Sequence, residues 1–171
     1  MATTPIIRIY NENNSKIQET WNAGVLDLSS SESFESDEKV INVWNNRYGT
    51  TDVPDLIGCN ITTKNINGDD IYEQVVTETW VRVCVDSIAQ TDPSTGKKIF
   101  SEVGGPIVAG VASQGATEEE KKEFVIRGSA NNGVPDDSLV NYSKITMKVV
   151  PTLNAKVTVH EFKTRISGYY I

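Results

Sequence analysis

Hydrophobic and polar residues alternate along several short stretches of the chain, and the clearest alternation covers residues 142–150. Here Ile145, Met147 and Val149 fall on one side, while lysine and threonine residues fall on the other. A period of two is produced by a strand that is buried on one face, whereas a helix repeats about every 3.6 residues. The pattern therefore predicts a β-strand with one face in a hydrophobic core.

Similar β-rich stretches recur along the chain and are separated by turn signals such as Asn67-Gly68 and residues 92–96. Further strands are predicted at residues 5–10, 39–44, 59–63, 72–88, 97–103, 107–112, 124–127 and 156–165. The first of them is interpreted as a strand or as part of an extended N-terminal arm covering residues 1–11. Residues 17–28 fit a helix or a strand equally well.

Helical signals are scarce. Thr117 and Glu120 have the spacing of a capping box, in which each side chain binds the other's backbone N–H at a helix start. This box predicts a single turn or a charged loop rather than a long helix. The predicted fold is therefore all-β: one antiparallel β-sandwich domain over residues 1–171, with long loops and at most one short helix.

Composition agrees with that fold and narrows the function. The 171 residues are 38% hydrophobic and 8% aromatic, which is enough for one substantial core. The formal net charge is −7, so a polyphosphate would be repelled, and we expect no nucleic-acid partner. No apolar run approaches the roughly 20 residues that span a bilayer, so no membrane partner is expected either.

Cysteine usage and the first residues point to one compartment. MATTPIIRIY lacks the basic and apolar regions of a signal peptide, which predicts synthesis in a reducing cytoplasm. Cys59 and Cys84 are accordingly expected to be free, buried thiols. A disulfide across a sandwich stays open as an alternative, because sequence does not place their Cα atoms.

Catalytic and metal-binding signals are weak throughout. His160 is the only histidine, and no nucleophile elbow, phosphate loop or dinucleotide motif occurs. Acidic residues pair at Asp69-Asp70, at Asp136-Asp137 and at Asp52 with Asp55, but none has calcium-loop spacing. We interpret these pairs as solvated turn residues. The expectation is a protein without catalytic residues, cofactor or metal.

One cluster fits sugar recognition. Trp44, Asn46, Arg47 and Tyr48 could supply an aromatic platform with hydrogen-bonding neighbours, as in carbohydrate-binding β-sandwich modules. The same residues also fit a core tryptophan at the end of a strand, followed by a turn. The core interpretation is favoured, and a carbohydrate- or receptor-binding module is kept as the alternative function.

The two ends of the sequence suggest contacts with other chains. Adjacent strand residues point to opposite faces, so Tyr169 and Tyr170 cannot both enter one core. Tyrosine is enriched at interfaces, because it has an apolar body and a polar tip. Residues 1–11 and 166–171 are therefore predicted to mediate assembly. The candidate contacts are Ile6, Ile7, Tyr10, Tyr169, Tyr170 and Ile171.

The acidic β-rich composition, the asparagine-rich turns and strands such as VINVWNN (residues 40–46) and TWVRVCVDSI (residues 79–88) resemble small virion proteins of tailed bacteriophages. These include capsid decoration proteins and accessory head or tail proteins. The resemblance implies a non-enzymatic structural protein that is made in the host cytoplasm and resides in the virion. It would act in many copies and bind itself and a capsid or tail protein.

Overall fold

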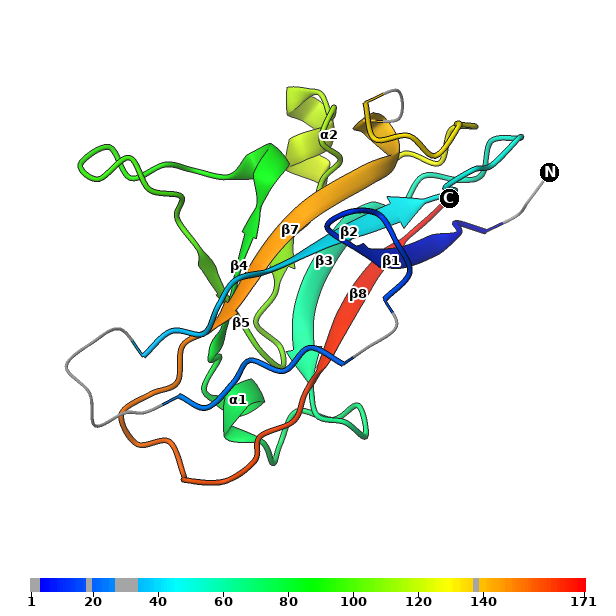
Figure 1. Ribbon diagram of the computed structural model, residues 1–171. Helices are drawn as coiled ribbons and strands as arrows, with labels where there is room; N and C mark the ends of the chain where they lie inside the picture. Colours follow the sequence, from blue (N-terminus) through cyan, green and yellow to red (C-terminus); the bar gives the residue numbers. More distant parts are fainter. Residues whose placement is uncertain (1–3, 18–19, 27–33, 137–138) are drawn as a thin grey trace.

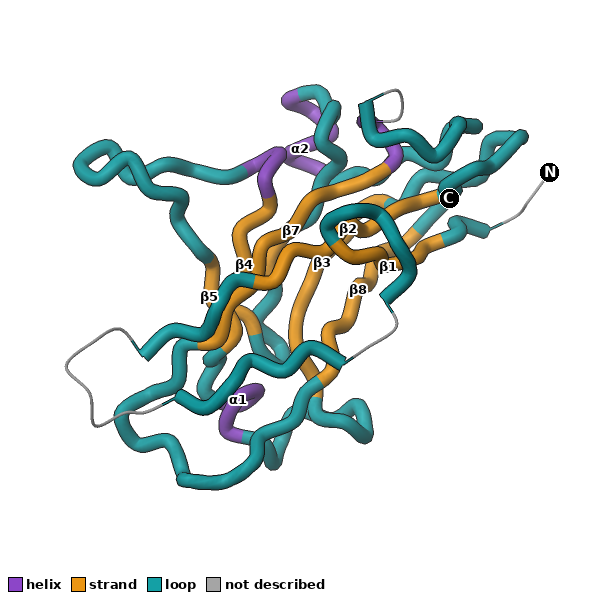
Figure 2. Tube along the Cα trace, in the orientation of Figure 1, coloured by secondary structure: helices purple, strands orange, loops and turns teal. Residues whose placement is uncertain are grey.

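A computed structural model describes residues 4–17, 20–26, 34–136 and 139–171, which form two antiparallel sheets with short helices (Figure 1). The strands are β1 (Ile7–Asn11), β2 (Lys39–Asn45), β3 (Ile57–Lys64), β4 (Val81–Val85), β5 (Ser101–Val103), β6 (Ala109–Gly110), β7 (Tyr142–Val149) and β8 (Lys163–Tyr169). The helices are α1 (Gln74–Thr77) and α2 (Glu118–Glu123), with short 3₁₀ turns at Asp86–Ile88 and Leu139–Asn141. Long loops join these elements (Figure 2).

The larger sheet has five strands in the order β1-β2-β7-β4-β5, and the smaller has three in the order β6-β3-β8. Every ladder in both sheets is antiparallel. The predicted all-β, sandwich-like fold is confirmed. Because β5 contacts both β6 and β3, the β6 edge of the small sheet lies near the β5 edge of the large one. β8 is therefore at the opposite edge of the small sheet.

Strand β7 is the centre of the large sheet, and its alternating pattern was correctly predicted as a strand. Ile145 pairs with Ile41 of β2 on one side and with Val85 of β4 on the other. Ile145 is fully buried, and so is Val43 of β2. The inward faces of these strands supply most of one layer of the core, and Cys59 and Ile61 of β3 belong to the other.

The prediction of a strand over residues 72–88 is wrong for the first half of this range. Residues Gln74–Thr77 form α1, and the strand begins only at Val81. Two features explain the difference: Val75 and Val76 are both buried, which a strand with one buried face does not allow, and Thr79 has a φ of 53°. Core packing outweighs the β preference of the valines.

The strand predicted at residues 156–165 also begins later, at Lys163. The preceding loop is held against α1 instead of pairing in a sheet. The backbone N–H of Lys156 donates to Gln74 Oε1 at 2.9 Å, and His160 Nδ1 lies 3.2 Å from Glu73 Oε2. Polar contacts with α1 thus take the place of a β-ladder.

Other predicted strands are shorter than their patterns suggested. Only Ser101–Val103 of the segment 97–103 and Ala109–Gly110 of the segment 107–112 are strands. In residues 124–127, Ile126 forms an isolated bridge with Leu56. The capping box of Thr117 and Glu120 is confirmed, and α2 is a six-residue helix.

Candidate functional site

Strand β8 is the most exposed long strand edge of the described residues. It pairs with β3 alone, so its other backbone edge has no strand beside it within the described part of the chain. Tyr169, Tyr170 and Ile171 are 57%, 47% and 99% exposed. A free strand edge is a template for pairing with another chain, and here the exposed apolar side chains lie at the C-terminal end of the edge, after the exposed Lys163 and Arg165.

A bulge in β3 shapes the end of this edge. Gly58 has a φ of +60°, and the register of β3 against β8 shifts between Ile57 and Asn60. A Cβ atom at Gly58 would lie 2.7 Å from the ring of Tyr169. The glycine therefore supplies both the left-handed backbone and the space in which the tyrosine ring lies.

Strand β1 is the other predicted contact region, and it is less accessible than expected. The segment is an edge strand paired with β2 rather than a free arm. Ile6 is tied at both backbone groups: its N–H donates to Asn45 Oδ1 and its carbonyl accepts from the N–H of Asn46, each at 3.0 Å. Ile6 remains 40% exposed, whereas Ile7 packs partly against the core.

Tyr10 does not suit the assembly role predicted for it. It is only 7% exposed and forms a small aromatic cluster with Trp44 and Tyr142. The ring of Trp44 stacks on that of Tyr142 with centroids 4.7 Å apart. The physical reason is that Tyr10 points to the same face of the sheet as Trp44, where these rings cover one another.

The predicted sugar-binding cluster has no exposed platform. Trp44 is completely buried, and its Nε1 donates to Asn14 Oδ1 at 2.7 Å. Asn46 is 4% exposed, and its amide donates to three backbone carbonyls. The guanidinium of Arg47 lies over the rings of three aromatic residues, 4.3 Å from that of Tyr10. Only Tyr48, at 60%, is well exposed.

Four asparagine side chains near this cluster fasten loops, and we call them the asparagine corner: Asn45, Asn46, Asn131 and Asn141. Asn141 donates to the carbonyls of Asn45, Arg127 and Ser129. Buried polar groups are stable only when hydrogen-bonded, and here they bind backbone carbonyls of β2 and of the neighbouring loops. The sequence signal was the frequency of asparagine in turns, but its partners could not be inferred.

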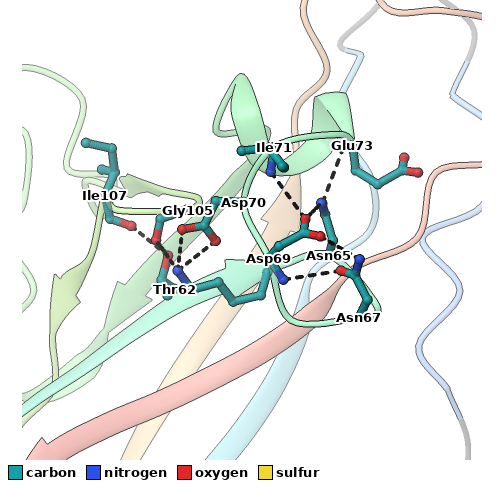
Figure 3. A network of polar contacts seen from close by, with 10 residues as sticks. Thr62, Asn65, Asn67, Asp69, Asp70, Ile71, Glu73, Gly105 and Ile107 are labelled. Atoms are coloured by element: carbon teal, nitrogen blue, oxygen red, sulfur yellow. Dashed lines mark hydrogen bonds and ion pairs between the residues drawn. The ribbon is translucent and has the colours of Figure 1, made fainter.

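The acidic pairs are also used within the chain. The carboxylate of Asp69 accepts from the side-chain amides of Asn65 and Asn67 and from the N–H of Ile71 (Figure 3). Asp70 forms an ion pair with Lys64 at 2.7 Å, and the Lys64 Nζ also donates to the carbonyl of Gly105. The pair thus organises the turn after β3.

The remaining acidic pairs give no cluster. Asp52 and Asp55 accept from the N–H groups of Ala130 and Gly128, each at 2.8 Å, and so fasten the loop of the asparagine corner. Of the pair Asp136-Asp137, Asp137 is outside the described residues. Within the described ranges, no group of three or more His, Cys, Asp or Glu residues is placed to hold a metal ion.

The nucleophile candidates lie in unreactive surroundings. Cys59 and Cys84 are free and buried, as expected. Burial raises the pKa of Cys59 to about 12 and also raises the pKa of Cys84, so neither thiol ionises readily. The ring of His160 packs edge-on against Trp80, with centroids 4.8 Å apart. These residues serve packing in the described structure.

The chain matches no protein-family model, and no curated protein or solved structure is significantly similar to it. No helix in the described ranges is long and apolar enough to cross a membrane. The candidate functional site is therefore a surface. It consists of the free backbone edge of β8 and the exposed aromatic residues at its end.

Proposed function

We propose that this protein is a non-enzymatic structural protein of a phage virion. It binds copies of itself and a capsid or tail protein in a decoration or accessory role. The observation that carries the proposal is β8, a seven-residue edge strand with one free backbone edge, followed by exposed Tyr170 and Ile171. Strand pairing and aromatic anchoring are a common basis of protein assembly.

The polar chemistry supports the same proposal. The asparagine corner and the Asp69 and Asp70 carboxylates bind the chain's own backbone and side chains. These groups stabilise loops and present no convergent set to a small substrate. The phage assignment itself comes from the sequence resemblance in residues 40–46 and 79–88.

Quantitative mass spectrometry of purified virions tests the proposal. Particles of the phage that encodes this chain should contain it in many copies. A double variant, Tyr169→Ser with Tyr170→Ser, should lower its copy number strongly, because it removes the aromatic anchors. The control is Val157→Ser, because Val157 is fully exposed on the loop that precedes β8 and is not one of the aromatic anchors. Absence of the wild-type chain from the particles would contradict the proposal.

A further inference from the structure

His160 lies in the loop between β7 and β8 and makes contacts at both of its ring nitrogens. Nδ1 lies 3.2 Å from Glu73 Oε2, at the start of α1, and Nε2 lies 3.1 Å from the backbone carbonyl oxygen of Lys156. The imidazole packs edge-on against the ring of Trp80, and only 15% of the His160 side chain is exposed. The ring is therefore fixed between α1 and its own loop.

Both partners of the His160 ring accept hydrogen bonds, and neither donates one. A carboxylate and a backbone carbonyl offer only lone pairs, whereas a neutral imidazole carries a single N–H. A neutral ring can thus donate to one partner alone, and its other nitrogen then faces an oxygen lone pair. The imidazolium carries two N–H groups and donates to both. The contacts around His160 therefore suit the protonated ring.

Acidic residues of α1 add to this preference. Glu73 precedes the first residue of the helix and contacts the ring directly, and Glu78 follows the last one. Hydrogen bonds from Thr152 and then from Trp80 hold the pKa of Glu78 below its usual value, and attraction to His160 acts in the same direction. Nearby opposite charges stabilise each other, so both carboxylates favour a charged ring.

The other segments near the ring contribute little net charge. On its own loop, Lys156 and Glu161 are exposed and carry opposite charges. The segment 20–26 packs through Trp21 against Phe162 and contains no charged residue. The two carboxylates of α1 are therefore the main electrostatic influence on the ring.

The histidine contact belongs to a set of polar contacts that fastens the loop to α1. The backbone N–H of Lys156 donates to Gln74 Oε1 at 2.9 Å, and the hydroxyl of Thr152 donates to Glu78 Oε2. Figure 1 shows α1 and the loop that precedes β8 at the same end of the fold. The loop is thus held on α1 mainly by side chains that bind across from one segment to the other.

Apolar burial contributes little to holding this loop. Ala155 packs partly against the core, whereas Leu153, Val157 and Val159 are largely exposed. Segments with few buried apolar contacts open locally at a low free-energy cost. The loss of one polar contact with α1 should therefore be enough to make the loop open more often.

We propose that His160 is a proton-dependent latch for the loop of residues 152–160. While the ring carries two protons, it bridges Glu73 and the carbonyl of Lys156, and the loop stays on α1. When the ring loses one proton, one of these contacts is lost. Histidine normally changes charge between pH 5 and 8, so this stabilisation is present at mildly acidic pH and is lost as the pH rises. Because the loop leads directly into β8, the latch also positions the start of that strand.

Amide hydrogen exchange measured by NMR on the full-length chain tests the latch. The reporter is the N–H of Lys156, whose protection depends on contact between the loop and Gln74. After correction for the intrinsic exchange rate, its protection factor should fall by about tenfold between about pH 5.5 and pH 8, because a hydrogen bond to a charged group is lost. His160 is the only histidine of the chain, so its ring signals report the titration without overlap.

Matched variants assign the effect to the ring. His160→Gln keeps a polar side chain but cannot gain a proton, so the protection factor should no longer depend on pH. Glu73→Gln keeps an acceptor oxygen and removes the charge, so the pH dependence should weaken. Glu161→Gln is the control, because Glu161 is exposed and adjacent in sequence, and it should behave as wild type. Circular dichroism checks folding, and Glu73→Gln replaces His160→Gln if that variant is unfolded.

Two results would overturn the inference. One is a Lys156 protection factor that is the same at both pH values in the wild-type chain. The other is a pH dependence that persists undiminished in His160→Gln, or in Glu73→Gln where that variant replaces it, which would assign the effect to another titrating group. Neither result bears on the proposed virion role, because the copy number in purified particles tests that role separately.

Discussion

The asparagine corner and the surface beside β5 and β6 are built on opposite principles. In the corner, polar side chains are buried and hydrogen-bonded to backbone carbonyls, so Asn45 and Asn141 are 0% and 1% exposed. Beside β5 and β6, the apolar side chains of Ile99 and Val108 are half exposed. Buried polar and exposed apolar groups are the informative exceptions in a folded protein. The corner contributes to stability, whereas the exposed apolar side chains contribute little to it.

The largest effect on stability is expected from the buried aromatic cluster beside the corner. Trp44→Ala should lower the free energy of unfolding by about 3–5 kcal/mol, because it leaves a cavity next to Tyr142. Tyr48→Ala is the control, since Tyr48 is mostly exposed, and it should change little. Urea denaturation followed by circular dichroism measures both. A loss below about 1 kcal/mol for Trp44→Ala would remove the basis for calling this cluster core.

The next largest effect on stability is expected at Asn46, where both hydrogen bonds and backbone strain contribute. Its amide donates to the carbonyls of Thr51 and Gly128, each at 2.8 Å, and its φ is +60°. Asn46→Ala should cost about 1–3 kcal/mol, because it removes the hydrogen bonds of a buried amide and places alanine in a left-handed backbone conformation. Asn46→Gly tolerates the left-handed backbone but also lacks the amide. Thermal unfolding measures both variants, and an Asn46→Ala variant as stable as wild type would contradict a contribution from these hydrogen bonds.

A smaller effect on the free energy of unfolding, which depends on pH, is expected at Glu120, which joins α2 to Arg127. Partial burial of Glu120 acts to raise its pKa, but hydrogen bonds from Thr117 and the contact with Arg127 outweigh it and lower the pKa. A lowered pKa in the folded state means that this stabilisation is present above the unfolded pKa, about 4.3, and is lost as the pH falls through the folded value.

The variant Glu120→Gln tests the direction of this pH dependence of stability. It should be less stable than wild type at pH 7, and the difference should shrink as the pH is lowered toward 3. Glu123→Gln, at the end of the same helix, serves as the control for a general charge effect. Chemical denaturation at several pH values measures the difference. A gap that widens on acidification would contradict the assignment.

The smallest effect on stability is expected at Val108, beside β6. Val108→Asp should change the free energy of unfolding by no more than about 0.5 kcal/mol, because Val108 is half exposed and no polar group depends on it. Thermal unfolding of the variant measures this. A large loss would mean that Val108 belongs to the core, and the contrast between the two regions would then fail.

Sequence patterns predicted the parts of the fold that local geometry determines. The alternation of residues 142–150 identified β7, and the spacing of Thr117 and Glu120 identified the start of α2. The prediction failed at Val75 and Val76, whose β preference is overridden by a helical turn packed on the core. Local propensity does not include that tertiary contact.

The sequence predicted the exposure of some candidate contact residues but not of others, for a related reason. Tyr169 and Tyr170 were recognised because neighbouring strand residues face opposite ways, and both are exposed. Tyr10 was misplaced, because the pairing of β1 with β2 puts it beside Trp44. The proximity of Ile99, Val108 and Phe124 was not predicted, since these residues come together only when the two sheets pack.

The free edge of β8 has a consequence for how an assembly that uses it would be limited. A strand edge pairs with one extended segment at a time, so a second segment on this edge would compete with the first. The size of such an assembly could thus be set by one competing protein that supplies an extended tail.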